Sequence, residues 1–302
     1  MDHSTSSFLC GYAVRLDLFV CAKEQDKKRA DGMVFNVFLL QGNTWAKFAT
    51  MCDWPHVGIA SIKPRGSDRV VLSIGGNGDY WEFLDATSSE HTGVIPGSNP
   101  FLARNLAVVE ERIFSVGMGR VVARWDSPGL WTRLDPTAPL PEGRACGFND
   151  LTGPSLIEMY AVGWRGEIWQ TNGDGSTWRQ IDSPISEHLN AACTLPDGSI
   201  VAVGYNGAMV RGKHDTWTVI ASGRPETLLD VCCFNGEVYV ATAFRILKLE
   251  DTGLMPVTQF AVASDIPSSC GALYPTHDGA GVFSLGPKDL FRLRDGAWER
   301  VV

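Results

Sequence analysis

A recurring short string limits how this chain can fold more than any other feature does. A run of β-branched and aromatic residues ends at a small residue, and a second such run begins after a tight turn. The small residues that mark successive copies are Gly75, Gly117, Gly163, Gly204, Thr242 and Gly286, spaced 38 to 46 residues apart. Self-similarity at this spacing is typical of repeat architectures, in which each unit buries its faces only against its neighbours.

A tryptophan that opens a short apolar strand gives a second marker. It follows several copies of the first, at Trp45, Trp131, Trp178, Trp217 and Trp298. The gaps from Trp45 to Trp131 and from Trp217 to Trp298 are about twice the others, which indicates two units that have lost the tryptophan, near 93–95 and 256–260. Restoring them gives seven units, and we expect the tryptophans to pack between neighbouring units.

Each unit reads as four short strands, here named A to D in chain order, with the glycine turn between B and C and the tryptophan on D. The third unit shows them over 105–109, 113–116, 121–125 and 130–134. No helical periodicity and no long βαβ spacing competes with this pattern. The sequence therefore predicts an all-β fold, a seven-bladed β-propeller of four-stranded antiparallel blades in a single domain, 1–302. The predicted blades are 7–48, 57–95, 101–134, 144–181, 189–220, 228–260 and 270–302. Because the last unit ends on its own D strand, we expect no strand exchange between the first and last blades.

The charge of the chain favours a protein partner over nucleic acid. The net charge is −8 and the pI is about 5.3, whereas a surface that neutralises phosphates is basic. An acidic surface suits a basic protein partner. Arg15 and Asp17 interrupt the first apolar stretch before a secretory signal could be completed, and no run reaches the ~18 apolar residues of a membrane span. The sequence thus predicts a cytoplasmic protein, a monomer, that binds neither nucleic acid nor a membrane.

One string resembles a known repeat family. Thr171-Asn-Gly-Asp-Gly-Ser-Thr-Trp178 resembles the Asp-box or BNR repeat, Ser/Thr-x-Asp-x-Gly-x-Thr-Trp, of sialidase-like propellers, and the related repeats of photosystem assembly-factor-like proteins and the wider WD40/YVTN/BNR-like superfamily. Gly173 stands where the motif has its aspartate, and Asp174 is shifted by one position. The resemblance covers one good copy and weaker echoes along the chain. It implies a turn that stabilises the C–D hairpin, a structural role and not a catalytic one.

No motif in the chain carries catalytic chemistry. The six histidines are scattered without metal-ligand spacing, and no nucleophile elbow, zinc-protease motif or phosphate-cradling loop occurs. Of the eight cysteines, we expect Cys10, Cys146, Cys193, Cys232, Cys233 and Cys270 on innermost A strands as buried free thiols, because no CxxC spacing indicates a metal. The sequence predicts no catalytic residue, no metal site and no cofactor.

The loops at one end of the blades are the predicted partner-binding surface. In a propeller of this strand order the D–A and B–C loops share that end, and loops on rigid scaffolds carry function. The D–A loops contain more acidic than basic residues. The basic ones are Arg144 and Arg224, and the acidic ones are Asp53, Asp135, Glu142, Asp182, Glu187, Glu226 and Asp265. Aromatic and polar residues without a role in the repeat also fall in these loops, and Trp, Tyr and Arg dominate interface energies. The predicted binding residues are Trp54, Asn77, Asp79, Asp135, Glu142, Trp164, Arg165, Asp182, Glu187, Tyr205 and Asn206.

These patterns predict a non-enzymatic protein-binding propeller. In its most specific form the prediction is a cytoplasmic immunity or inhibitor protein that neutralises a basic bacterial toxin, such as a nuclease, by binding it, since inhibitors of cationic enzymes gain specificity from opposite charge. Two alternatives stay open at this point. One is a glycan-binding or glycoside-processing sialidase-like propeller, and the other is an assembly-factor-like scaffold protein.

Overall fold

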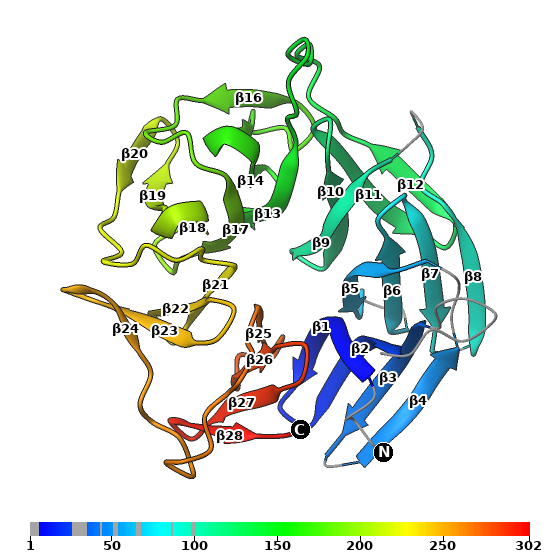
Figure 1. The fold of residues 1–302 in the computed structure, drawn as a ribbon. Coiled ribbons are helices and arrows are strands. Elements are labelled where there is room, and N and C mark those ends of the chain that lie inside the picture. Colours follow the sequence, from blue (N-terminus) through cyan, green and yellow to red (C-terminus); the bar gives the residue numbers. More distant parts are fainter. Residues whose placement is uncertain are drawn as a thin grey trace. The chain divides into compact units, whose positions relative to one another are not determined.

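A computed structural model describes residues 6–25, 35–42, 44–50, 54–64, 68–85, 87–97 and 101–302. Within these ranges the chain forms seven four-stranded antiparallel sheets, each made of four consecutive strands, with two single-turn 3₁₀ helices (Figure 1). The predicted fold class is confirmed: the protein is a seven-bladed β-propeller. Its contacts divide it into two compact units, Met1–His56 with Ala221–Val302 (unit 1) and Val57–Ile220 (unit 2). Whether they form one domain stays a prediction.

Unit 1 contains the first blade and the last two. The first blade is built from β1 (Ser6–Arg15), β2 (Leu18–Gln25), β3 (Phe35–Gln41) and β4 (Thr44–Thr50). The sixth has β21 (Asp230–Phe234), β22 (Glu237–Ala241), β23 (Ile246–Glu250) and β24 (Gly253–Pro256). The seventh has β25 (Ala272–Pro275), β26 (Val282–Leu285), β27 (Leu290–Arg294) and β28 (Ala297–Arg300).

Unit 2 contains blades two to five. The second blade has β5 (His56–Ile62), β6 (Val70–Gly75), β7 (Asp79–Leu84) and β8 (Ser89–Val94). The third has β9 (Ala103–Val109), β10 (Arg112–Gly117), β11 (Val121–Ser127) and β12 (Leu130–Arg133). The fourth has β13 (Phe148–Ser155), β14 (Glu158–Gly163), η1 (Trp164–Gly166), β15 (Ile168–Thr171) and β16 (Trp178–Ile181). The fifth has β17 (Leu189–Thr194), β18 (Ile200–Gly204), η2 (Tyr205–Gly207), β19 (Met209–Lys213) and β20 (Thr216–Val219).

Tryptophans of the fourth strands pack against aromatic residues of the preceding blade, as predicted. In unit 2 the rings of Tyr160 and Trp217 meet edge to face with centroids 5.9 Å apart, and in unit 1 Tyr239 meets Trp298 in the same way at 6.1 Å. Such pairs add specific geometry to the burial of large apolar surfaces. The repeated tryptophan is therefore a packing anchor between blades.

Acidic residues on two A strands link neighbouring blades by hydrogen bonds. The Asp150 carboxylate on β13 accepts hydrogen bonds from Asn105 Nδ2 of β9 at 2.9 Å and from the Ala192 amide of β17 at 2.9 Å. In unit 1 Asp230 Oδ2 likewise accepts from the Leu273 amide of the next blade at 2.7 Å. Burial raises the pKa of Asp150 to about 6, while these N–H donors oppose that rise.

The first and last blades pack together within unit 1. The Gly11 amide donates to Tyr274 Oη at 3.0 Å, and the rings of Phe19 and Phe283 stack with centroids 4.7 Å apart. Each terminal sheet keeps its own four strands, which confirms the prediction that none is exchanged. Among the described residues, no helix is long and apolar enough to cross a membrane.

The cysteines differ in part from the sequence expectation. Cys10, Cys193, Cys232 and Cys233 lie on A strands, but Cys146 and Cys270 precede β13 and β25 and lie in the connections. The prediction was wrong for these two because their blades begin pairing later than the apolar pattern does. All the cysteines in the described part of the chain are free thiols.

The Asp-box-like turn shows how the shifted aspartate is used. Asp174 Oδ1 accepts from the amides of Ser176 at 2.8 Å and Thr177 at 2.9 Å, and Thr177 Oγ1 donates to Oδ2 at 2.9 Å. These donors lower the pKa of Asp174 to about 2. Gly175 has a positive φ of 68°, and a β-carbon there would collide with the Leu156 carbonyl. Asp174 therefore performs the turn-stabilising role although it lies one residue late.

Candidate partner-binding surface

The B–C turns of blades four and five are built alike and carry four of the predicted binding residues. η1 holds Trp164 and Arg165, and η2 holds Tyr205 and Asn206. Arg165 and Asn206 both adopt left-handed backbone conformations, with φ of 59° and 55°. Each turn begins after a glycine because a β-carbon at that position would collide with a backbone carbonyl of the preceding D–A connection. The sequence thus fixes which side chains the turns present.

His188, at the end of the connection between β16 and β17, joins the two turns. Its ring lies 4.6 Å from that of Trp164 and 5.1 Å from that of Tyr205, measured between centroids. Its Nδ1 accepts the Arg165 amide at 2.8 Å, and its backbone carbonyl accepts the Tyr205 amide at 2.9 Å. We call Trp164, Arg165, His188, Tyr205 and Asn206 the His188 cluster. These contacts show that the B–C turns and the D–A connection meet at one end of these blades, as predicted.

The turn side chains of the His188 cluster reach solvent, whereas His188 itself holds the first turn. Tyr205 is 46% exposed, Trp164 is half-buried, and Arg165 and Asn206 are exposed. Within the described residues, the side-chain polar groups of Arg165, Tyr205 and Asn206 make no hydrogen bond or ion pair. A rigid aromatic surface with unused donors and acceptors is typical of an interface centre.

Two acidic residues share the connection that carries His188. Asp182 is exposed and Glu187 is half-buried, with Glu187 Oε2 accepting the Ser186 amide at 3.2 Å. They place negative charge on the connection that supplies the stacked histidine. A basic partner would meet this charge on approaching the aromatic residues.

A buried ion pair holds the base of the first turn. Glu167, directly after η1, accepts from Arg120 Nη2 at 2.7 Å and from Arg120 Nε at 2.8 Å, and both side chains are at most 10% exposed. Arg120 also donates to the Pro139 carbonyl at 3.2 Å and lies 4.8 Å from the ring of Trp169. The bidentate pair connects blades three and four below the Trp164 turn.

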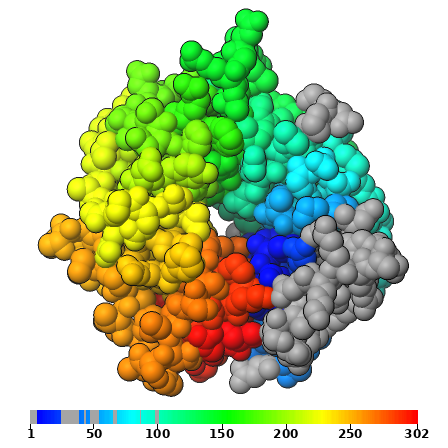
Figure 2. Space-filling model, viewed as in Figure 1, coloured from blue at the N-terminus to red at the C-terminus, as the bar shows by residue number. Residues whose placement is uncertain are grey.

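The connection from β12 to β13 carries two further predicted residues. It runs through exposed residues 137–140 and 142–145 and projects from the unit (Figures 1 and 2). Glu142 is exposed at this projection, but Asp135 serves the fold, since it accepts the Val122 amide at 2.7 Å and pairs with Arg133.

The remaining predicted residues lie elsewhere. Asn77 is exposed in the β6–β7 turn, and Asp79 is half-buried at the start of β7. Trp54 belongs to unit 1, is half-buried and packs on His56 with ring centroids 4.7 Å apart. Among the other acidic loop residues, Asp53 lies outside the described residues, and Asp265 forms an ion pair with Arg300 at 2.6 Å.

Sequence reasoning missed two residues of these loops. His188 gives no signal of its own, although the position before an A strand whose carbonyl binds the B–C turn recurs at Gly147. Phe244 lies in the B–C turn of blade six in unit 1 and is 70% exposed, the most of any large hydrophobic residue described. Its turn lacks the marker glycine, which has become Thr242, and so drew no attention.

The described residues contain no group of three or more histidine, cysteine, aspartate or glutamate side chains that could hold a metal ion. At the His188 cluster the aromatic and polar side chains are held in place before any partner binds. Flat aromatic and polar side chains on turns fixed by glycines and a buried ion pair can bind a partner without first being ordered.

The comparisons with known proteins yield one informative similarity. No family model matches the chain. Over 201 residues the chain is 33% identical to Immune protein Tsi7 of Pseudomonas aeruginosa, a stretch that covers 66% of this chain and 63% of that protein. The chain therefore spans less than two thirds of the length of this relative, to which it is similar in sequence.

Proposed function

We propose that the chain is a non-enzymatic immunity protein that binds and neutralises a toxin. The observation that carries the proposal is the 33% identity over 201 residues to a protein described as an immune protein. A propeller suits this role because its blades form a rigid scaffold and its loops are free to vary with the partner.

The His188 cluster is the binding surface that we propose on this scaffold. Trp164 and Tyr205 supply amphipathic contact area, and Arg165 and Asn206 supply hydrogen-bonding groups that the described residues leave unused. The preference of interface centres for aromatic residues and arginine supports this choice. Trp54, Asn77, Asp79, Asp135 and Glu142 stay candidates for the periphery.

The partner that fits this surface is a basic protein, such as a nuclease whose active site binds phosphates. The net charge of −8 and the acidic connection with Asp182 and Glu187 support it, because opposite charge steers association and excludes wrong partners. In this proposal the protein acts as a cytoplasmic monomer, and the Asp174 turn is a degenerate Asp-box of the WD40/YVTN/BNR-like repeats.

The test combines capture with toxicity. The tagged chain and a Trp164→Ala/Tyr205→Ala variant are used in parallel to capture proteins from the native host. Any protein that the unchanged chain retains and the double variant does not is then expressed in a laboratory bacterium, alone and together with the chain. Viable cells are counted in both cases.

The proposal predicts a basic protein that kills when expressed alone and is tolerated when the chain is co-expressed. A captured protein that is harmless alone, or whose toxicity the chain leaves unchanged, would contradict it.

A further inference from the structure

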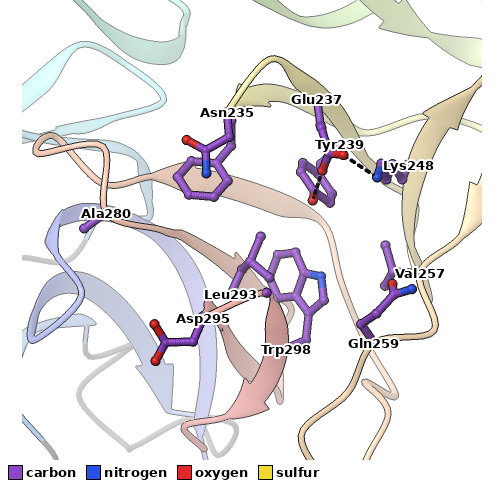
Figure 3. Close-up of a pocket in the computed structure, with 12 residues that line it drawn as sticks. Asn235, Glu237, Tyr239, Lys248, Val257, Gln259, Ala280, Leu293, Asp295 and Trp298 are labelled. Carbon is purple, nitrogen blue, oxygen red and sulfur yellow. Dashed lines mark hydrogen bonds and ion pairs between the residues drawn. The ribbon is translucent and has the colours of Figure 1, made fainter.

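A pocket of about 400 Å³ lies between blades six and seven of unit 1, at the end of the blades that carries the A–B and C–D turns. Its walls come from β21, β22, β23, β27 and β28, from the turns between paired strands, and from Val257 and Gln259 of the connection between β24 and β25 (Figure 3). Ligand pockets in proteins fall in this size range. The polar lining residues are Asn235, Glu237, Tyr239, Lys248, Gln259 and Asp295, and the main apolar ones are Val257, Leu293 and Trp298.

Trp298 differs from two other fourth-strand tryptophans in the bonding of its indole nitrogen. Trp178 Nε1 donates to the Leu134 carbonyl at 2.7 Å, and Trp217 Nε1 donates to the His214 carbonyl at 2.9 Å. Trp298 is only 2% exposed and lines the pocket, yet its Nε1 has no acceptor among the described residues. Trp131 Nε1 also lacks one, but that atom is fully enclosed. Trp298 Nε1 is not one of the fully enclosed unsatisfied atoms of the described residues, so it reaches the pocket space. A donor that faces a pocket and has no acceptor in the protein is positioned to bind an acceptor on a ligand.

A second donor lies on the side of the pocket toward which the Trp298 indole nitrogen points. Lys248 Nζ bonds Glu237 Oε1 at 2.5 Å, and Tyr239 Oη donates to Glu237 Oε2 at 2.8 Å. Both oxygens of Glu237 are thus occupied, whereas the lysine ammonium has further protons to donate. In Figure 3 the Trp298 indole nitrogen points toward the side of the pocket that holds Lys248, Val257 and Gln259. This end can bind a carboxylate.

The opposite end of the pocket carries a carboxylate of its own. Asp295, in the β27–β28 turn, lies on the far side of the Trp298 ring from the indole nitrogen, as Figure 3 shows. Its side chain is 89% exposed, and its nearest ion-pair partner is Arg294 Nε at 3.3 Å. This end can bind an ammonium group, and Leu293 and Val257 offer an apolar contact between the two ends.

We propose that this pocket binds a small zwitterion of the amino-acid and short-peptide class. The ligand's carboxylate accepts hydrogen bonds from Trp298 Nε1 and Lys248 Nζ, its ammonium group pairs with Asp295, and an apolar side chain lies between Val257 and Leu293. Hydrogen bonds to charged groups in a partly enclosed site give the selectivity. The site is separate from the His188 cluster and does not depend on the proposed function.

Unit 2 holds an equivalent pocket that serves as a control. It is about 290 Å³ in volume and lies between blades three and four, with Phe114 and Arg124 in the register positions of Tyr239 and Lys248. Trp178, the fourth-strand tryptophan of blade four, does not line this pocket, and its Nε1 donates to a backbone carbonyl. Arg124 pairs with Asp126 at 2.6 Å. The unused donor that defines the proposed site is missing from its counterpart.

The experiment measures binding of the dipeptide Gly-Leu to the full chain by isothermal titration calorimetry. It is repeated with the C-terminal amide of Gly-Leu, which lacks the carboxylate, and with N-acetyl-Gly-Leu, which lacks the ammonium group. The variants are Lys248→Met, Asp295→Asn and Trp298→Phe, with Arg124→Met as the matched control. The first two replace half-exposed or exposed side chains, so they decide the outcome if Trp298→Phe fails to fold.

We expect one Gly-Leu per chain, and about tenfold weaker binding for each blocked dipeptide and for each variant, because each change removes one charged or hydrogen-bonded contact. Arg124→Met should bind as the unchanged chain does. The proposal is overturned if Gly-Leu at about 10 mM, a concentration that would fill a millimolar site, gives no binding signal. It is equally overturned if the blocked dipeptides bind as well as Gly-Leu, or if Lys248→Met and Asp295→Asn bind it unchanged.

Discussion

The two ends of blade four use their turn residues in opposite ways. At the C–D end every side-chain bond of Asp174 goes to its own turn, to Ser176 and Thr177. At the B–C end the backbone of the Trp164 turn is held just as firmly, by the Gly147 carbonyl and His188 Nδ1, but the Arg165 side chain is exposed and unused within the described residues.

Blade five repeats the contrast. Asp197 in its A–B turn bonds Ser199 and Arg211, whereas Asn206 in its B–C turn has a side chain with no such role. The donors from Ser199 lower the pKa of Asp197 to about 2. Asp174 and Asp197 at one end of these blades thus bond within the fold, whereas the side chains of Arg165 and Asn206 at the other end make no such bond among the described residues and are, in our proposal, available to a partner. Substitutions of Asp174 or Asp197 should therefore change stability and leave binding unchanged, whereas substitutions of the exposed side chains of the B–C turns should weaken binding.

The largest expected effect is a loss of stability at the buried Arg120–Glu167 pair below the Trp164 turn. Arg120→Met leaves the buried Glu167 carboxylate without its bidentate partner, and breaking such a pair costs about 3 kcal/mol or more in unfolding free energy. Urea unfolding followed by tryptophan fluorescence measures it. The double variant Arg120→Met/Glu167→Leu should recover much of the loss, because no uncompensated charge stays buried. A loss below about 0.5 kcal/mol for Arg120→Met, the scale of ordinary surface changes, would show that the pair does not anchor this end.

Binding should depend next most strongly on the aromatic residues. Trp164→Ala and Tyr205→Ala each remove a ring from the stack with His188, and each should weaken the partner's Kd by about 2 kcal/mol, roughly thirtyfold. Surface plasmon resonance measures the Kd, and the melting temperature checks the fold. Unchanged affinity in both variants would show that the His188 cluster is not part of the interface.

The acidic connection should act mainly on the rate of association. Asp182→Asn with Glu187→Gln lowers the negative charge beside the cluster, so we expect association a few times slower at low salt, with the difference shrinking as ionic strength rises. Stopped-flow mixing at two salt concentrations measures it. A change confined to the dissociation rate would instead indicate a direct, desolvated contact.

The smallest expected effect is a change in melting temperature on substituting Asp174, at the C–D end. Asp174 has its pKa lowered from 3.8 to about 2 by its turn donors, so its contribution to stability is full above pH 4 and is lost as the pH falls toward 2. Asp174→Ala should therefore lower the melting temperature slightly at pH 7, and the difference should vanish near pH 2. Its partner affinity should stay unchanged, and a loss of affinity would break the contrast between the two ends.

The sequence predicted the blades well because inter-blade packing repeats. In blade three the predicted strand 105–109 is β9 (Ala103–Val109) and 130–134 is β12 (Leu130–Arg133), since the short apolar runs that form these strands can be recognised in the local sequence. The B–C turns were also predictable, because the glycines before Trp164 and Tyr205 permit a close backbone approach that other residues do not.

Residues that act across blades were not predictable. His188 stacks between two turns that precede and follow it in the chain, and the Asp150 carboxylate bridges three blades. The sequence also could not predict that the Trp298 indole nitrogen is unused, because such a donor is satisfied or not by a carbonyl elsewhere in the fold. These contacts depend on the three-dimensional placement of neighbouring blades and not on local pattern.

The most direct test of the account is hydrogen–deuterium exchange of the chain with and without its captured partner. We predict slower exchange in the complex at 164–166, 182–188 and 205–207, the segments of the His188 cluster, and unchanged exchange at 172–177, the Asp174 turn. Protection at 172–177 with none at 164–166 or 205–207 would place the partner at the opposite end of the blades and contradict the account.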